Sequence, residues 1–255
     1  FNMAITNATQ EKIIKHLNVM MMDKLKKYNP ETKYSPFITS LIRDEKRVNS
    51  YSFIHSLQTS LGMSAYEQIS KIIVESKGNI CNTQWKSPPM VDRKRLEKID
   101  QILTDIGNKT RLPNRIQEEK EILSIPNLDE IKKTQKKDGQ TVDVYIKTKE
   151  NEYYFDIKTV KPNKSGFLNH KRLILTWIAR ANKHINSAIV FPYNPYHPKK
   201  YSRVGFDQLS SEDVFIGKDY WDLIGGEGCY PQLLDAFNIA GMESWEKVQT
   251  KLDTL

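Results

Sequence analysis

Two aspartates and a lysine near the middle of the chain have the types and spacing that suit phosphodiester chemistry. Asp143 lies in one run of alternating apolar and polar residues, and Asp156 and Lys158 lie in a second. A period of two predicts strands, and the polar stretch between the runs predicts a turn centred on Glu150 and Asn151. Two carboxylates can hold Mg²⁺, which neutralises charge on a phosphate, while a lysine orients the attacking water or stabilises the developing charge. The segment therefore predicts a hairpin that carries a site for metal-assisted hydrolysis.

This turn fixes the expected register of the hairpin. It places Asp143 opposite Lys158 and Val144 opposite Ile157, so that one face is apolar and buried while the other presents the charged residues. Diagonal neighbours on one face of an antiparallel pair lie roughly 7–8 Å apart, which lets two aspartates share one divalent ion. We predict Asp143 and Asp156 as metal ligands, with the carbonyl group of Ile157 as a possible third.

A solvated surface hairpin is the alternative, since charged hairpin faces are common. The apolar residues around the charged ones favour an interior hairpin, where unpaired aspartates would be costly without a cation. These apolar residues are Val142, Val144, Ile146, Tyr153, Tyr154 and Phe155.

At these positions the sequence resembles the PD-(D/E)xK nuclease superfamily. Asp143 matches the first acidic position, and Asp156-Ile157-Lys158 matches the (D/E)xK triplet; Val142 stands where a proline often precedes the first aspartate. The residues that follow, up to Trp177, resemble type II restriction endonucleases of the TdeIII type. The resemblance implies Mg²⁺-dependent cleavage of double-stranded DNA, a restriction-endonuclease-like mixed sheet flanked by helices, and a homodimer on a symmetric site. The TdeIII type would imply a short GC-rich palindrome such as GGNCC.

The superfamily often adds an acidic residue from a helix before the hairpin, and Glu67 is our candidate. It lies in a segment where Tyr66, Ile69 and Ile73 recur at helical spacing. The competing interpretation is a capping box, in which Glu67 satisfies the amide group of Ser64 at the start of a helix and needs no metal. The sequence leaves both interpretations open.

Basic residues that follow the triplet are candidates for phosphate contacts. We predict DNA binding by Lys161, Lys164, Lys171 and Arg172, helped by the partial positive charge at the start of a helix near Phe167. Base reading more often uses Arg, Asn or Gln, and the sequence does not choose among the loop candidates. These are Asn82, Gln84, Arg111, Asn114, Arg115, Asn194 and Arg203.

Composition agrees with an anionic partner. The chain has 255 residues, a formal net charge of +8 and two distant cysteines, Cys81 and Cys229, with no zinc spacing. No apolar run is long enough to span a membrane, and no secretory signal precedes the first helix. A first residue other than methionine indicates that the numbering begins after a trimmed or unobserved start. Together these features predict a cytoplasmic protein with no membrane partner, and the resemblance to restriction endonucleases implies a prokaryotic one.

Helical and strand patterns predict an α/β fold with extra N-terminal helices in one endonuclease domain, residues 1–255. Residues 1–137 are expected to be mainly helical, 138–220 to form the catalytic α/β core, and 221–255 to form a C-terminal helical part. Helices are expected over 7–28, 36–61, around Glu67, over 96–106, 167–183 and 230–255; strands are expected over 187–191 and 213–216; a loop is expected over 76–93.

A sequence-specific type II restriction endonuclease is the leading functional hypothesis. A structure-specific or DNA-repair nuclease would use the same residues, and a catalytically inert DNA-binding module would not need all of Asp143, Asp156 and Lys158.

Overall fold

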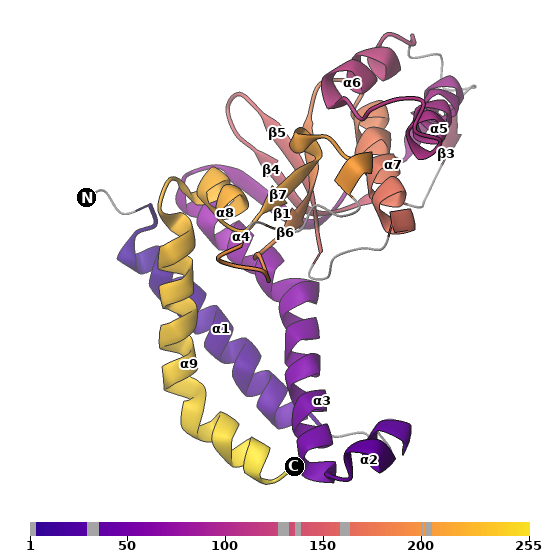
Figure 1. Cartoon of the computed structure of the whole chain (residues 1–255). Coiled ribbons are helices and arrows are strands. Elements are labelled where there is room, and N and C mark those ends of the chain that lie inside the picture. The colour runs from indigo at the N-terminus through magenta and orange to yellow at the C-terminus, as the bar shows by residue number, and fades with distance from the viewer. Residues whose placement is uncertain are drawn as a thin grey trace.

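The computed structural model describes residues 4–29, 36–126, 133–135, 139–158, 164–199, 201 and 206–255. A β-sheet with helices on both faces forms one end of the molecule, and long helices extend away from it (Figure 1). The helices are α1 (Asn7–Lys27), α2 (Pro36–Ile42), α3 (Glu45–Ser60), the π-helical segment η1 (Leu61–Ala65), α4 (Tyr66–Ser76), α5 (Arg93–Gly107), α6 (Arg115–Leu123), α7 (Lys164–Ala181), η3 (Phe206–Gln208), η4 (Ser211–Asp213), α8 (Lys218–Gly225) and α9 (Cys229–Asp253). The strands are β1 (Ile80–Lys86), β2 (Met90–Asp92), β3 (Lys133–Gln135), β4 (Thr141–Lys147), β5 (Glu152–Ile157), β6 (Asn186–Phe191) and β7 (Val214–Ile216).

The central sheet has the strand order β1-β4-β5-β6-β7, and β2 pairs with β3 separately. β1, β4 and β5 run antiparallel, whereas β6 pairs in parallel with both β5 and β7. Parallel neighbours need a crossover connection, which α7 supplies between β5 and β6. The predicted mixed sheet flanked by helices is therefore confirmed.

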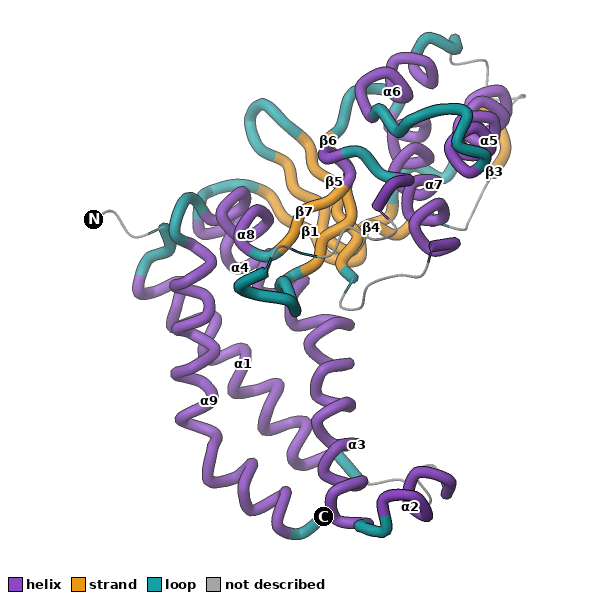
Figure 2. Tube along the Cα trace, viewed as in Figure 1, coloured by secondary structure: helices purple, strands orange, loops and turns teal. Residues whose placement is uncertain are grey.

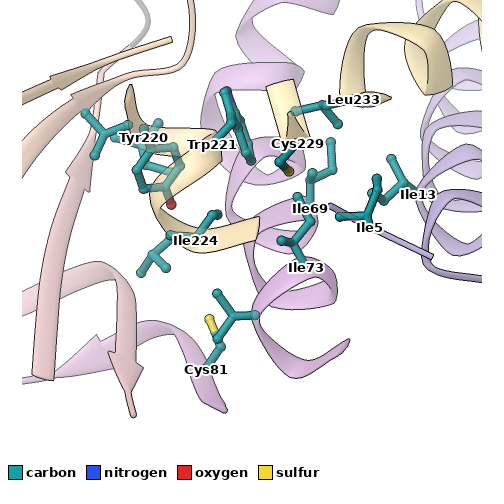
Figure 3. Close-up of a cluster of buried hydrophobic side chains, with 14 of the residues drawn as sticks. Ile5, Ile13, Ile69, Ile73, Cys81, Tyr220, Trp221, Ile224, Cys229 and Leu233 are labelled. Atoms are coloured by element: carbon teal, nitrogen blue, oxygen red, sulfur yellow. The ribbon is translucent and has the colours of Figure 1, made fainter. Parts of the chain in front are cut away.

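Both faces of this sheet are buried. On one face, α4, α8 and α9 pack on Val144 and Phe155, and Figure 3 shows part of this core around Trp221. On the other face, α5, α6 and α7 pack around Tyr154 and Trp177. The expectation of one apolar and one polar hairpin face is therefore wrong over most of the hairpin, because α5, α6 and α7 cover the second face.

Helices α1, α3 and α9 form an arm that extends away from the sheet (Figures 1 and 2). Ile13 and Leu17 of α1 are buried, as are Leu233 and Ala236 of α9. Leu234 is 51% exposed, because it lies one residue out of step with the buried stripe of α9. The arm is thus an amphipathic assembly that joins the sheet through its upper end.

One continuous helical rod, α3-η1-α4, links the arm to the sheet. The expected helix over 36–61 is instead broken between α2 and α3, where Arg43 has a φ of 57° and the Asp44 side chain caps α3 by accepting from the Arg47 amide group at 3.0 Å. The rod does not end near Gly62 as predicted, because η1 carries it into α4. Glu67 therefore lies inside a long helix rather than at the start of a short one.

Other differences concern short elements. The expected loop over 76–93 contains β1 and β2, so β1 adds a strand from the part predicted to be mainly helical. α6 and α8 were not expected; α6 begins at Asn114, whose side chain caps it by accepting from the Gln117 amide group. No helix within the described ranges has the length and apolar character needed to cross a bilayer. The cytoplasmic location stays a prediction.

A network of buried ion pairs holds α6, α7 and η4 together, and it overturns one predicted DNA contact. The Lys171 side chain is fully buried and pairs with Glu118 and, at 2.5 Å, with Asp213. Arg115 donates to the carbonyl group of Ile185 and, at 2.8 Å, to the hydroxyl group of Ser187. Lys171 cannot bind DNA, because no surface of its ammonium group reaches solvent.

We expect Lys171→Ala to lower the free energy of unfolding by about 3–5 kcal/mol, because it removes the cation that the buried carboxylates of Glu118 and Asp213 share. Urea unfolding followed by circular dichroism measures this change. Arg172→Ala is the control: Arg172 is the next residue and is 39% exposed beside Asp100, so its loss should cost at most about 1 kcal/mol. Equal stabilities of the two variants would contradict a structural role for the network.

Candidate active site

The β4–β5 hairpin turns one residue earlier in the chain than predicted. The Thr148 hydroxyl group accepts the Asn151 amide group at 2.9 Å, and the Thr148 amide group donates to the Asn151 carbonyl group at 2.9 Å. Val144 is therefore paired with Phe155 rather than with Ile157. Pairing shifts by two residues, so Val144, Ile146, Phe155 and Ile157 stay together on one face as predicted.

The two strands separate where the charged residues begin. Among the described residues, the β4–β5 ladder ends at the Val144–Phe155 pair, and β5 continues along β6. Beyond that pair, the Ile157 amide group donates to Asp143 Oδ2 at 2.8 Å. A side-chain carboxylate thus takes the place of a main-chain acceptor, which fixes Asp143 at the opening between the strands.

Asp156 lies at the same opening and is 5% exposed. Its Oδ1 atom accepts from Lys158 Nζ at 2.8 Å. Its Oδ2 atom is buried without a well-formed hydrogen bond, and His170 Nδ1 of α7 lies 3.4 Å from it, a distance suited to an ion pair when the ring is protonated. Burial raises the pKa of Asp156, but the contacts with His170 and Lys158 outweigh burial and bring the pKa below its usual value.

Glu67 reaches the same place from α4. The side chain is buried, and its Oε1 atom accepts from Gln84 Nε2 at 2.8 Å. The capping-box interpretation is wrong, because Ser64 lies within the π-helical segment and no side chain caps α4 at Ala65. Glu67 instead faces the strands, as the alternative interpretation required.

Gln84 of β1 joins two of these carboxylates. Its Nε2 atom also donates to Asp143 Oδ1 at 3.2 Å, so one amide group bridges Glu67 and Asp143. Its φ of 51° is rare for a residue other than glycine, and the β1–β4 ladder skips it between Thr83 and Trp85. The sequence marked Gln84 only as one base-reading candidate, because nothing local signals a left-handed residue in a strand.

Crowding of the carboxylates changes their acidity. Burial, followed by the negative charge of Asp143, raises the pKa of Glu67 to about 7. Burial, followed by the negative charge of Asp156, raises the pKa of Asp143 to about 6. The group thus has two acids that titrate near neutrality beside one that stays ionised, a pattern typical of functional sites.

A pocket of about 280 Å³ opens beside Asp156 and Lys158. Asn169, His170 and Arg172 of α7 line it. We did not predict Asn169 and His170 as site residues from the sequence, although their helical spacing with Arg172 places them near it on α7. Lys161 and the side chain of Lys164 lie outside the described residues.

Several base-reading candidates have internal roles. Arg111 pairs with Glu121 at 2.8 Å, Asn114 caps α6, and Arg115 belongs to the buried network around Asp213. Arg203 lies outside the described residues. Asn194 holds its own loop, since its Nδ2 atom donates to the Lys199 carbonyl group at 2.8 Å and its Oδ1 atom accepts from the Tyr196 amide group at 2.9 Å. Of the loop candidates, Asn82 stays a predicted base contact.

Asp143, Asp156 and Glu67 are the residues that could hold a metal ion. In the part of the chain that the structure describes, no three His, Cys, Asp or Glu side chains form a ready-made metal cluster. Mg²⁺ needs fewer protein ligands, since it is usually bound through one or two carboxylates and keeps several waters. The buried Asp156 Oδ2 atom, which lacks a well-formed hydrogen bond, fits such a cation.

Comparison with known proteins identifies the family. Residues 5–241 match the family model described as "Type II restriction endonuclease, HinfI". The type II restriction enzyme HgiEI of Herpetosiphon aurantiacus is 26% identical over 98% of this chain and 99% of its own length. The type II restriction enzyme MjaII of Methanocaldococcus jannaschii is 27% identical over 73% of this chain and 53% of its own length. No solved structure matches the chain.

These matches cover the whole sheet and most of the arm. They support the resemblance to restriction endonucleases; its narrower TdeIII detail is not confirmed. Enzymes of this type act on double-stranded DNA and generally depend on a divalent metal ion. The chain belongs to the HinfI family of type II restriction endonucleases, which are site-specific deoxyribonucleases.

Proposed function

We propose that this restriction endonuclease uses Mg²⁺ and that Asp143 and Asp156, with the carbonyl group of Ile157, hold the cation. The observation that carries the proposal is the convergence of Asp143, Asp156, Lys158 and Glu67 at the opened end of the hairpin. When bound, the cation neutralises charge on the scissile phosphate and acidifies a water molecule. The alternatives, a repair nuclease or an inert DNA-binding module, find no support in the family match.

Lys158 has the freedom to act on the reacting groups. Its side chain is 37% exposed and lines the pocket, while its ammonium group contacts Asp156. From that position it orients the attacking water or donates a hydrogen bond to the phosphate as charge develops. Pairing with Asp156 also directs the ammonium group toward the pocket.

Glu67 and Gln84 complete the acidic side of the site. Glu67, held by the amide group of Gln84, supplies a third carboxylate that takes up a proton near neutral pH. Gln84 acts as a positioning residue, because its one amide group fixes the spacing between Glu67 and Asp143. Partners of metal-binding carboxylates commonly affect metal affinity in this way.

DNA contacts next to the site come from α7. Arg172 lines the pocket, and we propose that it binds a backbone phosphate together with Asn169. Lys161 and Lys164 remain predicted DNA contacts. Each chain brings one such site, so we also propose that two chains cut a two-fold symmetric sequence as a homodimer.

Asp156→Ala should abolish cleavage while leaving specific DNA binding measurable in Ca²⁺, because the change removes a cation ligand and leaves the groove contacts in place. Plasmid digestion with Mg²⁺ and a mobility-shift assay with Ca²⁺ measure the two properties. Asp235→Ala, at an exposed position of α9, is the matched control and should cut like the wild type. Near-wild-type cutting by Asp156→Ala would remove the carboxylate from the site.

Without divalent ions, the protein should lose stability as pH rises toward 8. The pKa of Glu67 is raised from 4.5 to about 7, so the folded state holds this proton more tightly than the unfolded chain, and the stabilisation disappears as pH rises through that interval. Urea midpoints at about pH 5.5 and about pH 8 measure the loss. Glu67→Gln should show a smaller loss of stability. At limiting Mg²⁺ its cleavage rate should fall only near pH 6, where Asp143 titrates, whereas the rate of the wild type already falls near pH 7. An unchanged pH profile in Glu67→Gln would exclude Glu67 from the site.

Gln84→Gly should raise the Mg²⁺ concentration for half-maximal cleavage about 10–100-fold, because the carboxylates lose their shared donor. Glycine adopts a φ of 51° freely, so backbone strain does not confuse the result. Gln68→Ala is the control, since the Gln68 amide group donates to Thr83 and touches neither carboxylate. A shift in Gln68→Ala as large as in Gln84→Gly would assign the effect to general loosening of β1.

A further inference from the structure

The contacting helices α2 and α3 expose five large apolar side chains, here called the arm face: Phe37, Leu41, Ile42, Tyr51 and Ile54. Phe37 is 85% exposed, Leu41 is 78% exposed and Tyr51 is 60% exposed. α2 has no buried residue, and it lies beside α3 at the end of the arm that is far from the sheet (Figure 1). Exposed apolar patches of this kind mark sites of interaction with other proteins.

The five residues of the arm face carry no charge, and the charged residues that border it, between α2 and α3, include the exposed ion pair of Arg47 and Asp44. From Val48 to Tyr66 the chain has no Asp, Glu, Lys or Arg, although charged residues make up 27% of the protein and about five would be expected there. α2 has none either. Depletion of charge together with exposed aromatic and aliphatic side chains is the composition of an interface core.

DNA is the wrong partner for this surface. Binding to phosphates requires Lys or Arg; none of the five arm-face residues is basic, and the bordering Arg47 and Lys46 are paired with Asp44 and Asp253. The exposed apolar residues of α1 and α9 differ in this respect, because Met242 and Trp245 lie among Glu243, Glu246 and Lys247. The arm face is therefore suited to a protein surface that is itself apolar and uncharged.

A second copy of the chain provides that surface. In a two-fold symmetric contact each residue near the axis meets its own counterpart, so a face without charge avoids the repulsion that a net charge of +8 causes elsewhere. The exposed parts of the five side chains amount to on the order of 600 Å² per chain, against about 800 Å² for each partner of a standard interface. The neighbouring uncharged residues of α3 can supply the remainder.

We propose that the arm face is the surface through which two copies of this chain associate, an inference that rests on the proposed homodimer. The rod α3-η1-α4 then connects the interface directly to the site. Sixteen residues separate Tyr51 from Glu67, which corresponds to roughly 24 Å of helix. Association through the arm leaves the α7 pocket of each chain open to DNA.

Sedimentation velocity over a dilution series, with plasmid cleavage in Mg²⁺, tests this assignment. The variant is Leu41→Asp with Tyr51→Asp; Leu41→Asp alone is the milder second variant. We expect the dimer dissociation constant of the double variant to rise at least about 100-fold, because each change introduces like charges at a symmetric apolar contact. We expect the variant to convert supercoiled plasmid to the open circle, where the wild type gives linear product.

Two controls match the variants. Leu112→Asp changes an apolar residue that is 86% exposed in the loop before α6, and Met242→Asp changes a 64% exposed residue on the α9 side of the arm. Both should remain dimeric, and thermal melts should show all variants folded, because every changed side chain is exposed.

The remaining outcomes separate the inference from the proposed function. A double variant that stays dimeric overturns the arm face as the interface, whether or not the variant still binds DNA. Dissociation of Met242→Asp alone would move the interface to α9 and overturn it likewise. A wild type that is monomeric with and without DNA overturns both the homodimer and this surface. A wild type that dimerises through the arm face and does not cut in Mg²⁺ would contradict the proposed chemistry and leave the interface intact.

Discussion

Two carboxylates that repel each other must stay side by side in a buried place, and much of the structure serves this constraint. Asp156 is 5% exposed and Asp143 lies next to it, so each needs a donor from the protein. Asp143 takes the Ile157 amide group, which is available only because β4 and β5 separate at this point. Asp156 takes Lys158, two residues farther along the same strand. The separation of β4 and β5 thus serves electrostatics as well as structure, because it provides the donor that Asp143 needs beside Asp156.

Helices on opposite faces of the sheet deliver the other partners, and separate cores hold them there. α4 brings Glu67 to the site because Ile69 and Ile73 anchor it on the face that also receives α8. α7 brings His170 from the opposite face, and Lys171, the next residue, is locked into the buried ion-pair network. The positions of both side chains relative to Asp156 therefore depend on packing that no local sequence controls.

The sequence was sufficient for the parts of the molecule that local patterns determine. Alternation around Asp143 and Asp156 predicted the hairpin, and helical spacing predicted α1, α5 and α7 to within a few residues. The turn was displaced by one residue because the Thr148 hydroxyl group, a detail of turn chemistry, outweighed the polar pattern.

Long-range contacts explain what the sequence could not provide. The prediction that Lys171 binds phosphate was wrong because the partners of Lys171, Glu118 and Asp213, are distant in sequence and local patterns do not reveal them. The short motif from Ser64 to Glu67 satisfies a capping pattern, yet the helix before it continues through η1 and leaves nothing to cap. Gln84 owes its importance to a backbone conformation that arises only when β1 pairs with β4.

The π-helical segment η1 has a consequence for the angular phase of the rod. A π-turn inserts one extra residue into the helical register, and each residue advances the helix by about 100°. Residues on either side of η1 therefore keep a rotational offset that an uninterrupted α-helix of the same sequence would not have. Glu67 follows η1 directly, within the first turn of α4. One inserted residue thus sets the direction around the helix axis in which Glu67 points toward the sheet, compared with the direction in which Tyr51 points outward.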